Sequence, residues 1–228
     1  MADNYLERRM EDMKAGKLHQ RVQSKSAAPR KGYLEFPFPP RRVLAVGGIQ
    51  GLPLDIVRMF LRSGSKVAVL DTDKSAGEAL AYKEGIRYYN LEEPSSESIT
   101  SSFANLLQAW RDVDIIIMAK FHDLTTDLVI TWTAHRDRFP VPFGYAGRLI
   151  LLFDSPQIPQ SPRVFATYEP NISDSLLKLS SQLHPYRITA NAIMKSAGPL
   201  SELRDPLRLI QTLVLPGNDY LTSLLIPY

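Results

Sequence analysis

Residues 41–53, RRVLAVGGIQGLP, and residues 65–71, SKVAVLD, decide the fold of this chain. An apolar stretch, a turn with three glycines, an amphipathic helix, a second apolar stretch and a closing aspartate follow one another. This order is typical of a βαβ unit that holds a dinucleotide pyrophosphate at a helix N-terminus. Gly47 permits the tight turn, and Gly51 lets the backbone approach a phosphate.

Asp71 closes the second apolar stretch and is the candidate ligand for an adenosine ribose. Its carboxylate would accept hydrogen bonds from the ribose hydroxyls and repel a 2′-phosphate, so the sequence favours NAD over NADP. Gly48, Leu52 and Asn90 are further candidates for cofactor contacts. Pro53 replaces a third glycine and narrows the room for close helix packing or a phosphate. The alternative is a tight βα turn that binds nothing, followed by a capping or solvated aspartate.

Strands and helices alternate along the rest of the chain. Strands are expected at 42–46, 66–70, 86–89, 113–118, 148–153, 187–192 and 220–226, and helices at 53–63, 74–84, 95–110, 123–138, 171–184 and 206–215. Repeated βα units of this length predict an α/β fold, a Rossmann-like doubly wound parallel sheet in three layers. Residues 1–40 are expected to form a helical N-terminal arm, with a helix near 4–18, and a basic, proline-rich linker. Residues 41–228 form the Rossmann-like domain.

Composition excludes several classes of protein. The 228 residues are 44% hydrophobic and include no cysteine, so disulfide and thiolate chemistry are absent. No apolar run approaches the ~20 residues of a membrane-spanning helix. The four histidines are scattered and have no metal-ligand spacing, so no metal site is expected. We expect a cytoplasmic protein that does not enter a membrane.

Positive charge is concentrated before the domain. Residues 14–42 carry eight basic residues against one acid, whereas residues 43–228 sum to −2 within a total of +3. We interpret the basic stretch as a solvated linker; contact with nucleic acid or an acidic partner is the alternative. The acidic body argues against nucleic acid as a partner.

Residues 41–228 resemble the short-chain dehydrogenase/reductase family. Its glycine pattern, T-G-x-x-x-G-x-G, corresponds to Val46, Gly47, Gly51 and Pro53, so two of three glycines match. The segments WRDVDIII (110–117), GRLI (147–150) and LHPYRITANAI (183–193) are similar to the lead into that family's fourth strand, the start of its fifth, and its L-x-P-x-x-I-x-x-N-x-I stretch. The resemblance implies a Rossmann-type sheet, a nicotinamide cofactor such as NAD, and a dimer or tetramer.

The family's catalytic residues have no counterpart at the matching positions. In that family a tyrosine donates the proton, a lysine lowers its pKa, a serine orients the substrate and an asparagine completes a relay. Alignment on 183–193 puts Phe165 at the tyrosine and Glu169 at the lysine. Shifting the register to Tyr168 puts Ile172 at the lysine. The serine position falls at Asp154 or Ser155.

The loops that line the family's cofactor also differ. Residues 118–121, MAKF, stand where the family has N-N-A-G, and no asparagine lies between 121 and 147 to serve the relay. Lys195 and Ser196 replace a P-G pair after the sixth strand. Hydride transfer by the family mechanism is therefore not expected.

Two hypotheses follow for function. The first is a non-catalytic homologue that binds a nucleotide, or that acts as a homo-oligomer or as a partner of an active relative. In that case the N-terminal helix would contact a neighbouring subunit. The second is an enzyme, either an NAD-dependent oxidoreductase or a non-redox acid–base catalyst, with a rebuilt site. Its weak catalytic candidates are Asp154, Ser155, Tyr168 and Glu169, with Lys120 near them at the carboxyl edge of the sheet.

Overall fold

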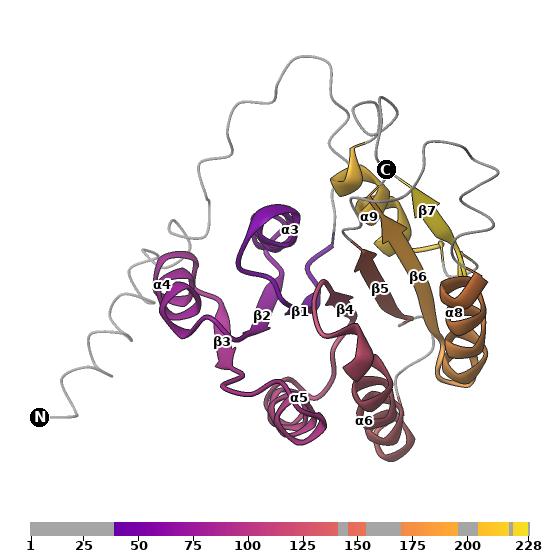
Figure 1. Cartoon of the computed structure of the whole chain (residues 1–228), viewed down its shortest axis with the longest axis horizontal. Coiled ribbons are helices and arrows are strands. Elements are labelled where there is room, and N and C mark those ends of the chain that lie inside the picture. Colours follow the sequence, from indigo (N-terminus) through magenta and orange to yellow (C-terminus); the bar gives the residue numbers. More distant parts are fainter. Residues whose placement is uncertain (1–38, 141–145, 154–169, 196–204, 219–220, 228) are drawn as a thin grey trace, which may run out of the picture. The chain divides into compact units, whose positions relative to one another are not determined.

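A single parallel sheet of seven strands organises the molecule (Figure 1). The computed structural model describes residues 39–140, 146–153, 170–195, 205–218 and 221–227. The strands are β1 (Arg42–Val46), β2 (Lys66–Asp71), β3 (Arg87–Asn90), β4 (Ile115–Met118), β5 (Gly147–Phe153), β6 (Ile188–Met194) and β7 (Leu225–Pro227). They lie in the order β3-β2-β1-β4-β5-β6-β7, and every pair is parallel. The order reverses between β1 and β4, which is where open α/β sheets bind ligands.

Among the described residues, three helices cover each face of the sheet. They are α3 (Gly51–Arg62), α4 (Lys74–Glu84) and α9 (Pro206–Val214) on one side, and α5 (Ser96–Trp110), α6 (Thr125–Arg138) and α8 (Pro170–Leu183) on the other. Short 3₁₀ turns, η1 (His122–Leu124) and η2 (His184–Tyr186), precede α6 and follow α8. The predicted three-layer Rossmann-like fold is confirmed.

The central strands are apolar because both their faces are buried. In β1, Val43 and Ala45 belong to the core under α3, α4 and α9, whereas Leu44 and Val46 belong to the core under α5, α6 and α8. All four residues of β4 are buried. Near-continuous apolar runs of this kind are what a parallel strand covered on both faces requires. The backbone that carries the site is therefore rigidly supported.

A network of ion pairs lies at the amino-terminal ends of β1 and β4. Asp112 accepts hydrogen bonds from Trp132 Nε1 and Arg136 Nη2, both at 3.1 Å. The Arg136 side chain is 3% exposed and the Asp112 side chain 9%. Beside them, Arg42 Nη2 donates to Asp114 Oδ1 at 2.6 Å. Burial lowers the pKa of Arg136, and the Asp112 carboxylate opposes that shift.

Element boundaries differ from the sequence prediction where side chains redirect the backbone. The last strand, expected at 220–226, is confined to Leu225–Pro227. Asn191 accounts for this, because its side chain accepts from Leu224 N–H and donates to the Leu221 carbonyl. The helix expected at 123–138 starts as a 3₁₀ turn and becomes α-helical at Thr125.

Some predictions concern residues that the structure does not describe. The helix near 4–18 lies outside the described residues, and the arm of residues 1–40 and its boundary with the domain remain predictions. Among the residues that the structure places, no helix is long and apolar enough to cross a bilayer.

Candidate functional site at the carboxyl edge of β1, β2 and β4

The glycine turn between β1 and α3 contains two residues with positive φ. Gly47 (φ +81°) and Gly51 (φ +57°) both lie in the left-handed region that favours glycine. Gly47 N–H donates to the Leu70 carbonyl at 2.8 Å, which ties the turn to β2. Apart from the adjoining backbone, a methyl group placed on Gly51 would have no heavy atom of the described residues within 4 Å. Among those residues, nothing covers the position of Gly51 at the start of α3.

The start of α3 is also electrostatically suited to an anion. The N-cap residue, Gln50, makes no side-chain capping bond, and the first turn contains no acidic residue. The first N–H groups of a helix have no intrahelical partner and carry the positive end of the helix dipole. The start of α3 is therefore favourable for an anion, although Pro53 contributes no N–H group.

Asp71 does not fit the ribose-binding role that the sequence assigns to it. Its side chain is completely buried, and Lys120 Nζ lies 3.3 Å from Oδ1 and 3.5 Å from Oδ2. Oδ1 also accepts from the Thr72 N–H at 2.7 Å. The Lys120 side chain, by contrast, is 44% exposed. Lys120 is the exposed member of this pair, and Asp73, an exposed carboxylate, follows two residues after the end of β2.

Lys120 reaches Asp71 by crossing the glycine turn. Its backbone N–H donates to the Val46 carbonyl, so the residue is anchored at the carboxyl ends of β1 and β4. A Cβ added to Gly47 would meet Lys120 Cγ at 2.6 Å and Cβ at 2.8 Å. The aliphatic stem thus fills the space over Gly47, and the lysine links three neighbouring strand ends.

Tyr88 forms hydrogen bonds with the backbone of Asp71 and with the Asn90 side chain. Its hydroxyl donates to the Asp71 backbone carbonyl at 2.9 Å and to Asn90 Oδ1 at 3.3 Å. Its ring lies where a side chain on Gly77 would be, which brings α4 close to β3. Burial, reinforced by the charges of Asp71, Asp73 and Glu78, raises the pKa of Tyr88 to about 12. The phenol is neutral at physiological pH and acts as a hydrogen-bond donor.

Aromatic side chains lie at the carboxyl ends of β4 and β5, next to the positions where the family resemblance implies N-N-A-G and a serine. Phe121 stands at the position of the last residue of N-N-A-G and has φ +57°, which is unusual for a bulky residue. His122 stacks on Phe153 with ring centroids 4.4 Å apart. Its Nε2 lies 2.9 Å from the Leu152 carbonyl oxygen. Both rings serve packing, which leaves no relay group among these described residues.

His122 should make stability depend on pH. Burial lowers its pKa below 6.5, against the opposing effect of the Leu152 and Met118 carbonyls. Below about pH 6.5 the unfolded chain therefore binds a proton that the folded chain does not, so stability falls as the pH falls. Urea denaturation at pH 7.5 and 5.5 should show this loss for the wild type and a smaller loss for His122→Gln. Equal losses for the two proteins would contradict the assignment.

The remaining sequence candidates fall into three groups. Gly48 is buried, and a Cβ there would meet Ala45 Cβ at 2.9 Å, so it serves close packing of α3 on β1. Leu52 packs partly buried against the core on the α3 side, and Asn90 bonds Tyr88 as above. The catalytic candidates Asp154, Ser155, Tyr168 and Glu169 lie outside the described residues, as does Phe165.

Sequence reasoning missed that Lys120 pairs with Asp71. Lys120 stood among possible acid–base groups, and Asp71 among the cofactor ligands. The two residues are 49 positions apart. The available signal was the strand order, because β1 has β2 on one side and β4 on the other. Because β2, β1 and β4 are parallel neighbours, the residues that follow them lie together at the carboxyl edge of the sheet.

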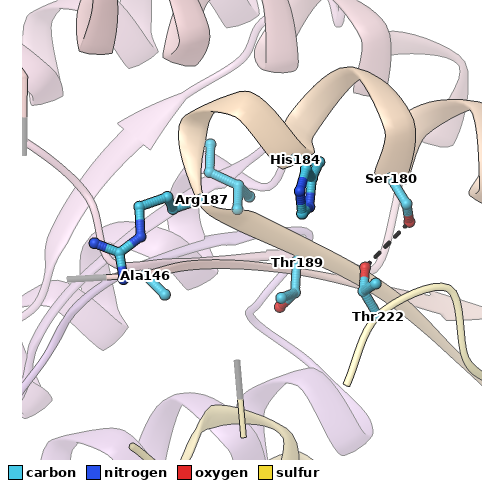
Figure 2. A pocket seen from close by; sticks show the side chains of 7 residues that line it. Ala146, Ser180, His184, Arg187, Thr189 and Thr222 are labelled. Carbon is cyan, nitrogen blue, oxygen red and sulfur yellow. Dashed lines mark hydrogen bonds between the residues drawn. The ribbon is translucent and has the colours of Figure 1, made fainter. Parts of the chain in front are cut away.

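A shallow pocket lies at the opposite, amino-terminal edge of the sheet (Figure 2). Its lining includes Thr189, Arg187 and His184, and a hydrogen bond from Thr222 Oγ1 to Ser180 Oγ borders it. Ligands of open α/β sheets bind at the carboxyl edge, so this pocket is not the site indicated by the turn. Within the described ranges, no group of three or more acidic or histidine side chains is placed to hold a metal ion.

Comparison with solved structures identifies the class of fold. No family model matches the chain. The chain is similar to a structure of BdcA in complex with NADPH, with 16% identity over 84% of this chain and 94% of that one and a TM-score of 0.59. It is similar to BdcA from E. coli, with 18% identity over 85% and 100% of the two chains and a TM-score of 0.58.

A double mutant of a Serratia marcescens short-chain dehydrogenase/reductase is a third similar structure, with 15% identity over 85% and 98% of the two chains and a TM-score of 0.60. The chain therefore has a short-chain dehydrogenase/reductase-like fold, as the resemblance implied. At these identities the likeness concerns the fold, and function must be argued from the site.

Proposed function

We propose that this protein binds a nicotinamide dinucleotide at the carboxyl edge of β1, β2 and β4 without catalysing hydride transfer. The observation that carries this proposal is the glycine turn at the point where the strand order reverses, with an uncapped α3 that starts at Gly51. The NADPH complex of BdcA, which has the same fold, supports the ligand class. The diphosphate would lie on the first turn of α3, held by backbone N–H groups.

The non-catalytic part of the proposal depends on the carboxyl ends of β4 and β5. Lys120 and Phe121 stand where the family's N-N-A-G pattern supplies two small residues, and His122 follows them. The lysine is paired with Asp71, and the histidine is stacked on Phe153. Neither is arranged to donate a proton to a carbonyl substrate, because general acid–base catalysis needs a free group within hydrogen-bond reach.

A turnover assay tests this combination of binding without catalysis. Full-length protein at micromolar concentration is mixed with NADPH or NADH and a panel of aldehydes and ketones, and cofactor absorbance is followed. We expect no oxidation above the uncatalysed rate, although the cofactor binds. Substrate-dependent oxidation that is lost in Asp154→Ala or Glu169→Ala would instead establish the rebuilt-enzyme alternative.

The proposed working form is an oligomer, either of this chain or with an active relative in the cytoplasm. Large apolar side chains are exposed on two of the three helices that share one face of the sheet: Ile130 of α6 is 59% exposed and Leu177 of α8 is 58% exposed. The proposal is that these two side chains belong to one apolar patch, because a contiguous patch favours burial in an interface. Light scattering after size exclusion should give a mass above one chain, and Ile130→Asp with Leu177→Asp should lower it.

A further inference from the structure

We propose that a groove at the amino-terminal ends of β2 and β3 is a second binding site of this protein and takes single-stranded nucleic acid. The groove has a volume of about 520 Å³, and its lining includes Lys66, Arg87 and Trp110. Lys66 begins β2 and Arg87 begins β3, so the groove lies at the edge of the sheet opposite the glycine turn. The inference is therefore independent of the proposed function.

Basic residues stand side by side at the start of three neighbouring strands. Arg42 in β1 is the register partner of Lys66 in β2, and Arg87 in β3 pairs with Ala68, so the three basic side chains lie on one face of the sheet. Asp114 neutralises Arg42 at 2.6 Å. Lys66 and Arg87 are exposed, and no carboxylate of the described residues forms an ion pair with either. Neighbouring like charges repel, and an anion in the groove would relieve that repulsion.

Further basic side chains surround the groove. Arg62 ends α3, Lys83 lies in the last turn of α4 and Arg111 follows α5, and all three are exposed. Cations at the carboxyl ends of helices complement the helix dipoles, which accounts for these three. That explanation does not extend to Lys66 and Arg87, which begin strands. The net charge of −2 for residues 43–228 therefore includes a local excess of positive charge, and a groove of one sign concentrates anions.

An aromatic ring in the groove favours nucleic acid over an acidic protein. The guanidinium carbon of Arg87 lies 5.9 Å from the centre of the Trp110 ring, and this tryptophan is half-buried. Proteins that hold single-stranded nucleic acid combine a basic groove with aromatic and arginine side chains on which the bases stack. Trp110 and Arg87 together offer a base such a surface, and Lys66 offers a charge to a phosphate. An acidic peptide supplies the charge but no base to stack.

The basic linker joins the domain beside this groove. Arg41 N–H donates to Ser65 Oγ at 2.9 Å, and Ser65 is one of the lining residues. Residues 14–42 carry eight basic residues against one acid, and in the sequence they lead directly to this point. A nucleic acid strand has phosphates enough for the groove and for such a run of lysines and arginines.

Fluorescence anisotropy of the full-length protein with labelled single-stranded DNA and RNA of mixed sequence tests the inference. We expect the wild type to bind with micromolar affinity at low salt. Lys66→Gln with Arg87→Gln should weaken binding by about tenfold or more and lower the slope of log affinity against log salt by about 1.4, or about 0.7 for each lost phosphate contact. Lys74→Gln with Lys178→Gln removes two exposed lysines of α4 and α8 and should bind as the wild type does.

Tryptophan fluorescence gives a second measurement at the groove itself. Trp132, the other of the two tryptophans, is completely buried, so quenching by an unlabelled oligonucleotide reports on Trp110. We expect quenching in the wild type and in the control variant, and little in Lys66→Gln with Arg87→Gln.

Three results would overturn the inference. The first is no binding by the wild type, and the second is equal binding by the groove variant, which would assign the contact to the linker alone. The third is displacement of the oligonucleotide by poly-glutamate at equal charge concentration, which would assign the groove to an acidic protein. Binding of NADPH is a separate measurement, so none of these results bears on the proposed function.

Discussion

Asp112→Ala should lower the free energy of unfolding by about 3–5 kcal/mol, because it leaves a buried guanidinium without its counter-ion. The Arg136 side chain is 3% exposed, and its shortest contact with a carboxylate is the 3.1 Å bond to Asp112. Trp132 Nε1–H loses its acceptor in the same change. The buried Trp132 N–H group, left without a hydrogen bond, further lowers the free energy of unfolding. Urea denaturation followed by tryptophan fluorescence gives the value.

Two further variants show whether the loss of stability comes from the unpaired buried charge or from the loss of an ion pair in general. Glu84→Ala breaks the more exposed Arg58–Glu84 pair, whose shortest contact is 3.3 Å, and should cost less than about 1 kcal/mol. Asp112→Asn with Arg136→Met removes both buried charges and should recover part of the loss. A loss below 1 kcal/mol for Asp112→Ala would show that the guanidinium reaches water.

Gly47→Ala should cost about 2–5 kcal/mol, because two penalties add at one position. At φ +81° an alanine is strained by contact between its Cβ and the backbone. Its methyl group would also lie 2.6 Å from Lys120 Cγ and 2.8 Å from Lys120 Cβ. Those atoms are close to the anchored backbone of Lys120, so the lysine cannot simply swing aside. The cost is measured by urea denaturation.

Gly51→Ala is the matched control, since it changes the other glycine of the same turn. Its φ is +57°, but in the part of the chain that the structure describes an added methyl group has no neighbour within 4 Å beyond the adjoining backbone. Only the conformational penalty applies, and we expect a loss of about 1–2 kcal/mol. Equal losses for the two variants would show that the Lys120 stem does not occupy the space over Gly47.

The sequence was sufficient to predict the elements whose local signals are strong. The helix at Lys74–Glu84 has the predicted bounds, and in the structure Asp73 caps it and Gly85 ends it in the left-handed conformation. The strand at Arg42–Val46 was placed correctly because an apolar run leads into glycines. Less accurate boundaries occur where a distant side chain intervenes. The expected strand at 113–118 begins at Ile115, after the buried acids Asp112 and Asp114.

The candidate site was predictable as a set of strand ends, but the contacts between its residues were not. Glycine spacing and the position of Asp71 indicated a phosphate turn and a ribose ligand. Asp71 pairs with Lys120, which follows β4, two βα units further along the chain. No local pattern reports such a contact. The same limit applies to His122, whose stacking on Phe153 requires β4 and β5 to be neighbours.

The most direct test of the central claim is calorimetric titration of full-length wild-type protein with NADPH, beside Gly51→Val. The open space at the start of α3 should accept the diphosphate, so we expect one site per chain with micromolar affinity. Gly51→Val fills that space with a β-branched side chain in a left-handed conformation, and binding should be lost while the protein stays folded by circular dichroism. No heat of binding at millimolar NADPH, or equal binding by both proteins, would contradict the account.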